Sequence, residues 1–557
     1  MSQSLKAAVS TLIAPDSLIV AGYFLLVFVA GALVARRFAH RATSEFITGG
    51  RTFTWKQTGL TLLAFAVDPT YMGMAGVGFL WGMYLSQWIG VHIWFTSWIA
   101  AMFLVPIYWR TRIVTTPEYL ERRFNAKCRA LFSVLMAAIL VIILTSAMYL
   151  GALLITRMLG WPLPVSVGAI AVVCTFYVIA GGLQTVLVLD VYQGAILLVT
   201  LIVVTWRIVA EIGGLGALAA IAVPGNAGVP VGSLLPPLDL KPDTTVFFAG
   251  PAILLWATFA GLSWIACNFG MVQRLLASRT ERDAQKSLLF LAVLANIACF
   301  ATFAVGAAMR KYRPEVPADE GYMWVMLNMF PVGARGLLVA GMMAALLSSA
   351  DGLLTASSTL ITQDIYLRFL RPAARDREIK LATRVLEAVA MVLALTLIPI
   401  AMSRQSAVAF VQEFFGDLMG VVVALYIVGV FSRRATARAA FVAMLSALAL
   451  AIGLHAWNMW STGRAEPGPL PALARLNFAY RGFVSFAYAI VATLVLSRFE
   501  PAPDPARLTN LTVHTVADAP GPWVGLKSWP GLWKWALGLS LGWFAFTVAW
   551  EWYGRTH

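Results

Sequence analysis

Residues 344–354 read Ala-Ala-Leu-Leu-Ser-Ser-Ala-Asp-Gly-Leu-Leu, which places two adjacent hydroxyls and a carboxylate in a segment apolar enough to cross a bilayer. An aspartate at the centre of a membrane helix costs about 2.5–3.5 kcal/mol, so a chain that keeps one there usually has a use for it. Ala345, Ser348 and Ser349 are spaced i, i+3 and i+4, so they share one helical face. Two hydroxyl oxygens beside a backbone carbonyl predict a seat for a small hard cation.

The composition is that of a polytopic membrane protein. Of the 557 residues, 60% are hydrophobic and 12% are charged, and the mean hydropathy is +0.79. The apolar runs predict an all-α fold of about fourteen transmembrane helices: 17–36, 55–80, 84–108, 130–158, 163–180, 185–212, 246–273, 287–309, 336–363, 381–403, 408–432, 436–457, 477–497 and 531–553.

The distribution of basic residues predicts the orientation of these spans. With both termini outside, the inside segments carry 27 of the 41 Lys and Arg residues, as the positive-inside rule requires. The net charge of +15 is therefore mostly a topology signal. No loop is long enough to supply the basic surface that a nucleic-acid partner would need. We expect an integral protein of a bacterial inner (plasma) membrane.

An enzyme is not expected. The sequence has no nucleotide-binding loop and no recognisable nucleophile–base motif, and its four cysteines lack metal or disulfide spacing. The inside segment 498–528 is rich in proline and is expected to be a flexible linker.

The second span is expected to be interrupted. Residues 62–67 are apolar and run into Asp68, Pro69 and Thr70, with glycines following. Proline removes a backbone donor and disfavours helical geometry at the preceding residue. A broken membrane helix is tolerated where it lines a cavity, because its freed backbone groups need partners.

Several motifs together resemble the sodium:solute symporter family, over about residues 17–440. In chain order they are residues 44–51, 116–124, 181–186 with Asp190 and Gln193, 272–277, and the stretch from Ser348 through Tyr366. The resemblance implies a leucine-transporter-like core of two inverted five-helix repeats, at 55–212 and 246–432, with an outside loop at 213–245. Residues 1–54 would form an N-terminal accessory helix and inside loop, and residues 433–557 would form C-terminal accessory helices.

The resemblance also implies a sodium site at mid-membrane. Its ligands would be the backbone carbonyls of Ala64, Val67 and Ala345 and the hydroxyls of Ser348 and Ser349. Neutral oxygens suit a monovalent cation that must also be released.

The membrane-depth carboxylates are a second expectation. Some family members have a second sodium site, but here its two hydroxyl positions are Asp351 and Gly352. Asp190, Asp351 and Asp68 could form a second cation site or bind a coupling proton; alternatively, Asp68 could pair with a cationic substrate group, or the carboxylates could cap helix ends or pair with an arginine. For Asp417, pairing with a nearby arginine is expected.

The solute pocket is expected beside the break. Its candidate residues are Thr70, Tyr71, Gln87, His92, Trp264, Asn268, Gln412 and Glu413.

The resemblance implies a secondary symporter that imports a small polar organic solute by alternating access, with sodium as the coupling ion and no cofactor. Acidic pocket candidates favour a solute with an amine, such as an amino acid, and sugars and carboxylates stay open as alternatives. Two alternatives stay open: a proton-coupled carrier on the same fold, and a transporter-like solute sensor with a separate signalling partner. The partners expected in every case are the solute and the lipid bilayer.

Overall fold

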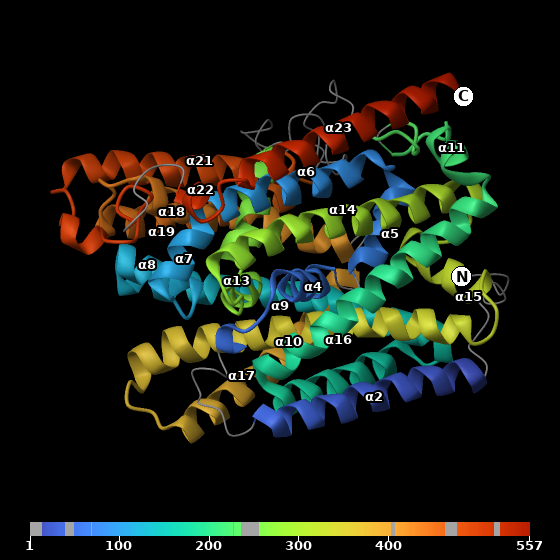
Figure 1. Cartoon of the computed structure of the whole chain (residues 1–557), viewed down its shortest axis with the longest axis horizontal. Coiled ribbons are helices and arrows are strands. Elements are labelled where there is room, and N and C mark those ends of the chain that lie inside the picture. Colours follow the sequence, from blue (N-terminus) through green and yellow to red (C-terminus); the bar gives the residue numbers. More distant parts are fainter. Residues whose placement is uncertain are drawn as a thin grey trace.

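The computed structural model describes residues 14–38, 49–67, 70–226, 228–235, 255–402, 407–462, 476–516 and 524–557. In these ranges the protein is a bundle of helices, and its only β pairings are isolated bridges. Figure 1 shows most of the long helices lying roughly parallel, with α2, α10, α16 and α17 on one side and α14, α6 and α23 toward the other. The short helices α4 and α13 lie between these two groups.

The first half of the described chain contains the elements up to the long outside loop. They are α2 (Ala14–Phe38), η1 (Gly49–Arg51), α4 (Trp55–Ala66), α5 (Thr70–Leu80), α6 (Tyr84–Ile99), η2 (Ala100–Leu104), α7 (Val105–Thr111), α8 (Thr116–Arg123), α9 (Ala126–Leu159), α10 (Leu163–Glu211) and α11 (Gly214–Ala219).

The second half contains the elements after that loop. They are η3 (Ala257–Gly261), η4 (Ser263–Cys267), α13 (Phe269–Leu276), α14 (Glu281–Tyr312), η5 (Ala318–Glu320), α15 (Gly321–Asn328), α16 (Ala334–Ile361), η6 (Thr362–Leu370), α17 (Asp376–Met402), α18 (Ala407–Phe431), α19 (Ala437–Thr462), α21 (Phe478–Leu496), η7 (Ser497–Phe499), η8 (Pro505–Leu508), α22 (Val524–Ser528) and α23 (Leu532–Thr556).

The predicted all-helical class is confirmed, but the number of fourteen spans is not. Among the described residues, 8 helices are long and apolar enough to cross a membrane by themselves. One of the remaining predicted spans, 55–80, is divided into α4 and α5, whereas 84–108 runs without a break through α6, η2 and α7.

The predicted interruption of the second span is confirmed. Helix α4 ends at Ala66, Val67 has non-helical backbone angles (φ −106°, ψ 84°), and α5 begins at Thr70. Asp68 and Pro69 lie outside the described residues. The start of α4 is fixed by Thr54 and Gln57, each of whose side chains bonds to the other's backbone.

Helix α10 covers two predicted spans, and both of its halves pass the same part of α16. Cys174 lines one cavity together with Leu347, and Asp190 is hydrogen-bonded to Ser348. Sixteen residues of straight helix would separate Cys174 from Asp190 by about 24 Å. The two halves therefore do not form one straight rod.

The inside segment 498–528 is not a loose linker where the structure describes it. The Tyr119 hydroxyl donates to the Leu511 carbonyl at 2.9 Å, and the Val513 amide donates to the Val430 carbonyl at 3.0 Å. Leu511 and Val513 are buried. The expectation of a flexible linker was wrong here because apolar residues follow the prolines.

Helices α5 and α14 cross closely enough to require glycine on both sides. A Cβ on Gly306 would lie 1.9 Å from the Ala75 carbonyl oxygen, and a Cβ on Gly78 would lie 2.7 Å from the Phe303 carbonyl oxygen. Small residues allow such close approach of membrane helices. This crossing holds α5, the second half of the interrupted span, against the bundle.

We expect Gly306→Ala to lower the free energy of unfolding by about 1–3 kcal/mol, because the added methyl group overpacks the crossing. The measurement is the thermal unfolding midpoint of the purified protein in detergent. Gly453→Ala is the matched control, because a Cβ there meets nothing within 4 Å and alanine favours a helix. Equal midpoints for the two variants would contradict the close crossing.

Candidate functional site

The end of α4 leaves backbone carbonyls without helical partners inside the bundle. The Val67 amide donates to the Leu63 carbonyl at 2.8 Å and closes the last turn. The carbonyls that follow have no continuing helix to accept from, as at every helix end. The Ser349 hydroxyl donates to the carbonyl of Ala64 at 3.3 Å, across 285 residues of sequence.

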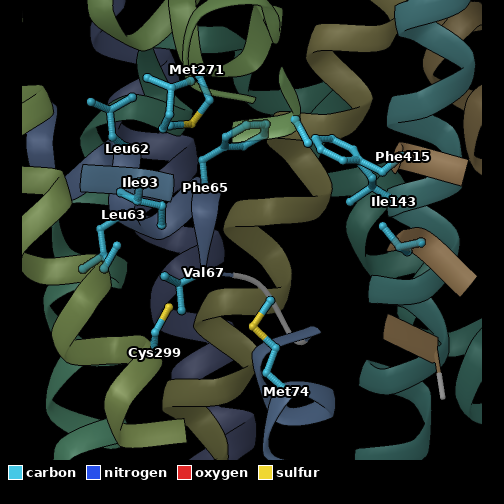
Figure 2. Packing of buried hydrophobic residues seen from close by; sticks show 14 of the residues in the cluster. Leu62, Leu63, Phe65, Val67, Met74, Ile93, Ile143, Met271, Cys299 and Phe415 are labelled. Carbon is cyan, nitrogen blue, oxygen red and sulfur yellow. The ribbon is translucent and has the colours of Figure 1, made fainter. Parts of the chain in front are cut away.

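The structure therefore brings the two predicted halves of the cation site together. Ala64, Val67, Ser348 and Ser349 are fully buried, and Ala345 is 1% exposed. Figure 2 shows Val67 at the point where α4 ends. Ser349 and Ala64 present neighbouring oxygens without formal charge, which is a donor set that suits a monovalent cation. Both oxygens can face one ion once the Ser349 hydrogen turns away.

Ser348 is held by a buried ion pair. Its hydroxyl donates to Asp190 Oδ1 at 2.6 Å, and Asp190 Oδ2 accepts from Arg274 Nη2 at 2.8 Å and from Nε at 3.2 Å. Both charged side chains are fully buried. A hydroxyl that donates its hydrogen to a carboxylate keeps its lone pairs free, so Asp190 orients Ser348 as an acceptor or ion ligand.

Arg274 begins the segment 274–286, one of the predicted inside segments, but the structure places its side chain in the interior of the bundle. Arg274 lies on α13, with its guanidinium over the ring of Phe65, 4.3 Å from the ring centre. Its Nη1 donates to the Gly270 carbonyl at 3.0 Å. The basic side chain that helped to assign topology is in fact part of the buried site.

The ring of Phe65 fills the space between α4, α13 and α16. A Cβ on Gly270 would lie 2.3 Å from the ring, and a Cβ on Gly352 would lie 2.5 Å from it. Trp264 stacks on the ring at 5.9 Å with the planes 5° apart. Phe415 of α18 makes an edge-to-face contact with Trp264, with ring centroids 5.8 Å apart. Figure 2 shows Phe65 on α4 and, across from it, Phe415.

A second interrupted span, in the seventh predicted segment, was missed by the sequence analysis. The π-helical segment η4 ends at Cys267, and Asn268 is extended (φ −62°, ψ 118°) before α13 begins. Its side-chain Oδ1 accepts from the Gly270 amide at 2.9 Å and caps α13. The order Asn-Phe-Gly at 268–270, with a cap-forming residue inside an apolar run, is the signal that could have found it.

Asn268 and Trp264, two of the predicted pocket residues, both lie at this second interruption. They are close together, as residues that line one pocket should be. Asn268 is fully buried, and its Nδ2 has no hydrogen-bond partner in the described part of the chain. Thr116 of α8 donates to the carbonyl of Cys267 at 3.0 Å, which ties the interruption to α8. A buried amide without a partner is a group that a polar ligand could satisfy.

The other candidate residues of the solute pocket differ in their surroundings. Gln412 on α18 is half-buried, and its Oε1 has no partner among the described residues; Glu413 beside it is half-buried. Gln87 is bound to the C-terminal helix instead, with Nε2 donating to Thr547 and Oε1 accepting from Trp543.

The remaining candidates fall where the structure gives no side chains. Asp68 lies outside the described residues, and Thr70, Tyr71 and His92 are described in their backbone alone.

Asp351 and Asp417 are both buried carboxylates, but they differ in their partners. Asp417 is paired with Arg481 at 2.9 Å, with His455 Nδ1 at 2.7 Å from its other oxygen, so the expectation that it pairs with an arginine is confirmed. Asp351 is 1% exposed, and neither of its carboxylate oxygens has a partner within the described ranges.

The fold and the two helix interruptions are typical of membrane transporters. The profile of the sodium:solute symporter family matches residues 46–447. The chain belongs to the sodium:solute symporter family.

Named relatives are similar over most of their length. The chain is 27% identical to the sodium/glucose cotransporter of Vibrio parahaemolyticus, over 79% of this chain and 84% of that protein. It is 28% identical to the sodium/mannose cotransporter of Bos taurus, over 93% of this chain and 91% of that protein.

Solved structures show the same fold. A sodium-coupled sialic acid symporter in a substrate-bound outward-open state superposes with a TM-score of 0.73 at 19% identity, covering 88% of this chain and 98% of that one. The nucleobase-cation-symport-1 family transporter Mhp1 gives a TM-score of 0.52 at 15% identity, covering 83% and 97%. At such identities the likeness concerns the fold alone.

The family establishes the type of activity. The chain is a sodium-coupled solute transporter and not an enzyme, and sodium is its coupling ion. No cofactor is implied by this activity.

We expect Asn268→Ala to lower the free energy of unfolding by about 1 kcal/mol, because it removes the cap of α13. Asn268→Ser is the matched control, since serine caps a helix but has no amide donor. Both variants should weaken solute binding, whereas the thermal unfolding midpoint should fall in the alanine variant alone. Wild-type solute affinity in Asn268→Ser would show that the side-chain amide of Asn268 does not bind the solute.

Proposed function

We propose that this protein is a sodium-driven importer of a small polar organic solute, with one sodium ion held by Ala64, Val67, Ala345, Ser348 and Ser349. The observation that carries the proposal is the contact between the Ser349 hydroxyl and the Ala64 carbonyl at 3.3 Å. It joins a broken helix of the first part of the chain to the polar face of α16, in the interior of the bundle.

The driving force is sufficient for concentrative uptake. One positive charge that enters a cell with a membrane potential of 100 mV gains about 2.3 kcal/mol. This free energy corresponds to roughly fifty-fold accumulation of the solute before any sodium concentration gradient is added. A carrier with a single sodium site therefore suffices for import.

The proposed mechanism is alternating access about a fixed central site. In the proposal, two inverted five-helix repeats at 55–212 and 246–432 move relative to each other around the interrupted helices. The segments 1–54, 213–245 and 433–557 lie outside the repeats. Fourteen spans with both termini outside, in a bacterial inner membrane, complete the proposed topology, and the basic inside loops support it.

A sugar is the first candidate solute. The relatives named above are cotransporters of glucose and mannose, and the proposed pocket offers neutral polar groups from Asn268 and Gln412 beside the ring of Trp264. The remaining candidates, Thr70, Tyr71, His92 and Glu413, would complete it, whereas both polar ends of Gln87 are bound to α23.

An amino acid is the second candidate, favoured by the half-buried carboxylate of Glu413 on α18. A solute amine could pair with this group. Thermal shift with a panel of sugars and amino acids, each with and without sodium, separates the two classes, because a ligand that binds the native state raises the unfolding midpoint. Stabilisation by amino acids alone would exclude the sugar.

Two alternative activities are separated by transport assays. A proton-coupled carrier would show uptake that follows a pH gradient at fixed sodium. A solute sensor with a separate signalling partner would bind solute without accumulating it. Uptake by proteoliposomes against a solute gradient, driven by sodium alone, contradicts both.

We expect the double variant Ser348→Ala/Ser349→Ala to lose sodium-stimulated uptake while it remains folded, because it removes two of the five ligands. The matched control is Ser357→Ala/Ser358→Ala on the same helix, whose hydroxyls donate to the carbonyls of Leu354 and Thr355 in their own helix. The measurement is initial uptake against external sodium concentration. Normal apparent sodium affinity in the first variant would refute the site.

A further inference from the structure

Three ionisable side chains are buried together between α10, α13 and α16, and they are two acids and one arginine. Asp190 and Arg274 form an ion pair with both side chains fully buried. Asp351 lies one helical turn beyond Ser348, is 1% exposed, and has no hydrogen-bond partner on either carboxylate oxygen within the described residues. One guanidinium therefore serves two carboxylates.

Arg274 lies within reach of both acids. The charged groups that act on the Asp351 carboxyl are Asp190 and Arg274. Arg274 Nη2 is 2.9 Å from the position that a Cβ on residue 352 would occupy. Gly352 follows Asp351 directly, so the guanidinium already touches the helix that carries the unpaired acid.

The local packing allows the guanidinium to turn without leaving its place. Its Nη1 is anchored by the Gly270 carbonyl at 3.0 Å, and its plane lies over the ring of Phe65. The absence of a side chain at Gly352 lets Nη2 and the ring of Phe65 approach the backbone of α16, since a Cβ there would lie 2.9 Å from Nη2 and 2.5 Å from the ring. A buried carboxylate without a partner is costly, so pairing with Asp351 offsets the loss of pairing with Asp190.

The position of Arg274 decides what Ser348 faces. With Arg274 on Asp190, as in this structure, the charge of the carboxylate that orients Ser348 is neutralised. With Arg274 on Asp351, the same carboxylate keeps its full negative charge beside the cation site. A negative charge at that distance in a buried setting attracts a sodium ion strongly.

We infer that Arg274 exchanges between Asp190 and Asp351, and that this exchange switches the sodium site from low to high affinity. The inference rests on the proposed sodium site. Asp351 acts in it as a positioning residue, because it holds Arg274 away from Asp190 and does not touch the ion. The state described here, with Arg274 on Asp190, is the low-affinity one.

The first test is Asp351→Asn, which keeps the size of the side chain and removes its charge. Arg274 then has Asp190 as its sole acidic partner, so the sodium concentration for half-maximal uptake should rise by about tenfold, within the usual range of coupling between sites. Asp351→Glu keeps the charge and should stay near wild type. Asp417→Asn is the matched control, since Asp417 pairs with Arg481, and it should not change sodium affinity.

The second test is the double variant Asp351→Asn/Arg274→Gln. Removing the guanidinium frees Asp190 permanently, so sodium affinity should return to the wild-type range or above, with slower turnover. If Asp351 served packing alone, a second buried substitution at Arg274 would not restore the sodium affinity of Asp351→Asn. Sodium-dependent thermal shift of the purified variants reports binding independently of turnover, and size-exclusion profiles confirm that each variant is folded.

Each outcome of these tests supports or overturns the exchange of Arg274 between Asp190 and Asp351. A weakened Asp351→Asn variant that is rescued by Arg274→Gln supports the exchange. Sodium affinity within about twofold of wild type in folded Asp351→Asn overturns it, as does a double variant that stays as weak as the single one. If Asp351→Asn does not fold, a sodium affinity well below wild type in folded Arg274→Gln overturns it, because removal of the guanidinium should leave Asp190 free. Wild-type protein that ignores sodium overturns the proposed function and this inference together.

Discussion

The rest of the site depends on the backbone carbonyls at the end of α4, which have no helical hydrogen-bond partners inside the membrane. When α4 ends at Ala66, its last carbonyl oxygens lose their partners in the next turn and need others inside the protein or in a cavity that it lines. Ser349 supplies one partner from α16. In the proposed site a cation supplies a better one, since it can bind several of these oxygens at once. Affinity for an ion would then offset the cost of breaking the helix.

The same turn of α4 links the proposed ion site to the proposed solute site. Ala64 offers its carbonyl to the first, and the ring of its neighbour Phe65 stacks on Trp264, which lines the second. Phe65 is held between glycines on α13 and α16 and beneath the guanidinium of Arg274. A shift of α4 caused by ion binding would therefore act directly on Trp264 through the ring of Phe65.

The parts of the site that follow from local chemistry could be predicted from the sequence. A proline inside an apolar run predicts an interruption, and serines spaced along one face of a buried helix predict where its partner lies. The interruption at Asn268 was missed because no proline or charge marks it; an asparagine cap in an apolar run is a weak signal until the structure shows it.

Partners distant in sequence could not be predicted. Nothing local indicates that Arg274 enters the bundle to meet Asp190, because a basic residue at a span edge usually marks an inside loop. Likewise, the bonds of Gln87 to Thr547 and Trp543 depend on how α23 packs against α6. The number of fourteen spans stays a prediction, since 8 helices of sufficient length and apolarity are found among the described residues.

The central claim is that the end of α4 and the twin hydroxyls of α16 hold one monovalent ion. An experimental density map of the protein in sodium, at a resolution that resolves bound ions, tests it most directly. The account predicts a single ion contacted by the carbonyls of Ala64, Val67 and Ala345 and by Ser348 and Ser349. A continuous helix through residues 67–69, or an ion bound elsewhere with these oxygens bonded to one another, would contradict it.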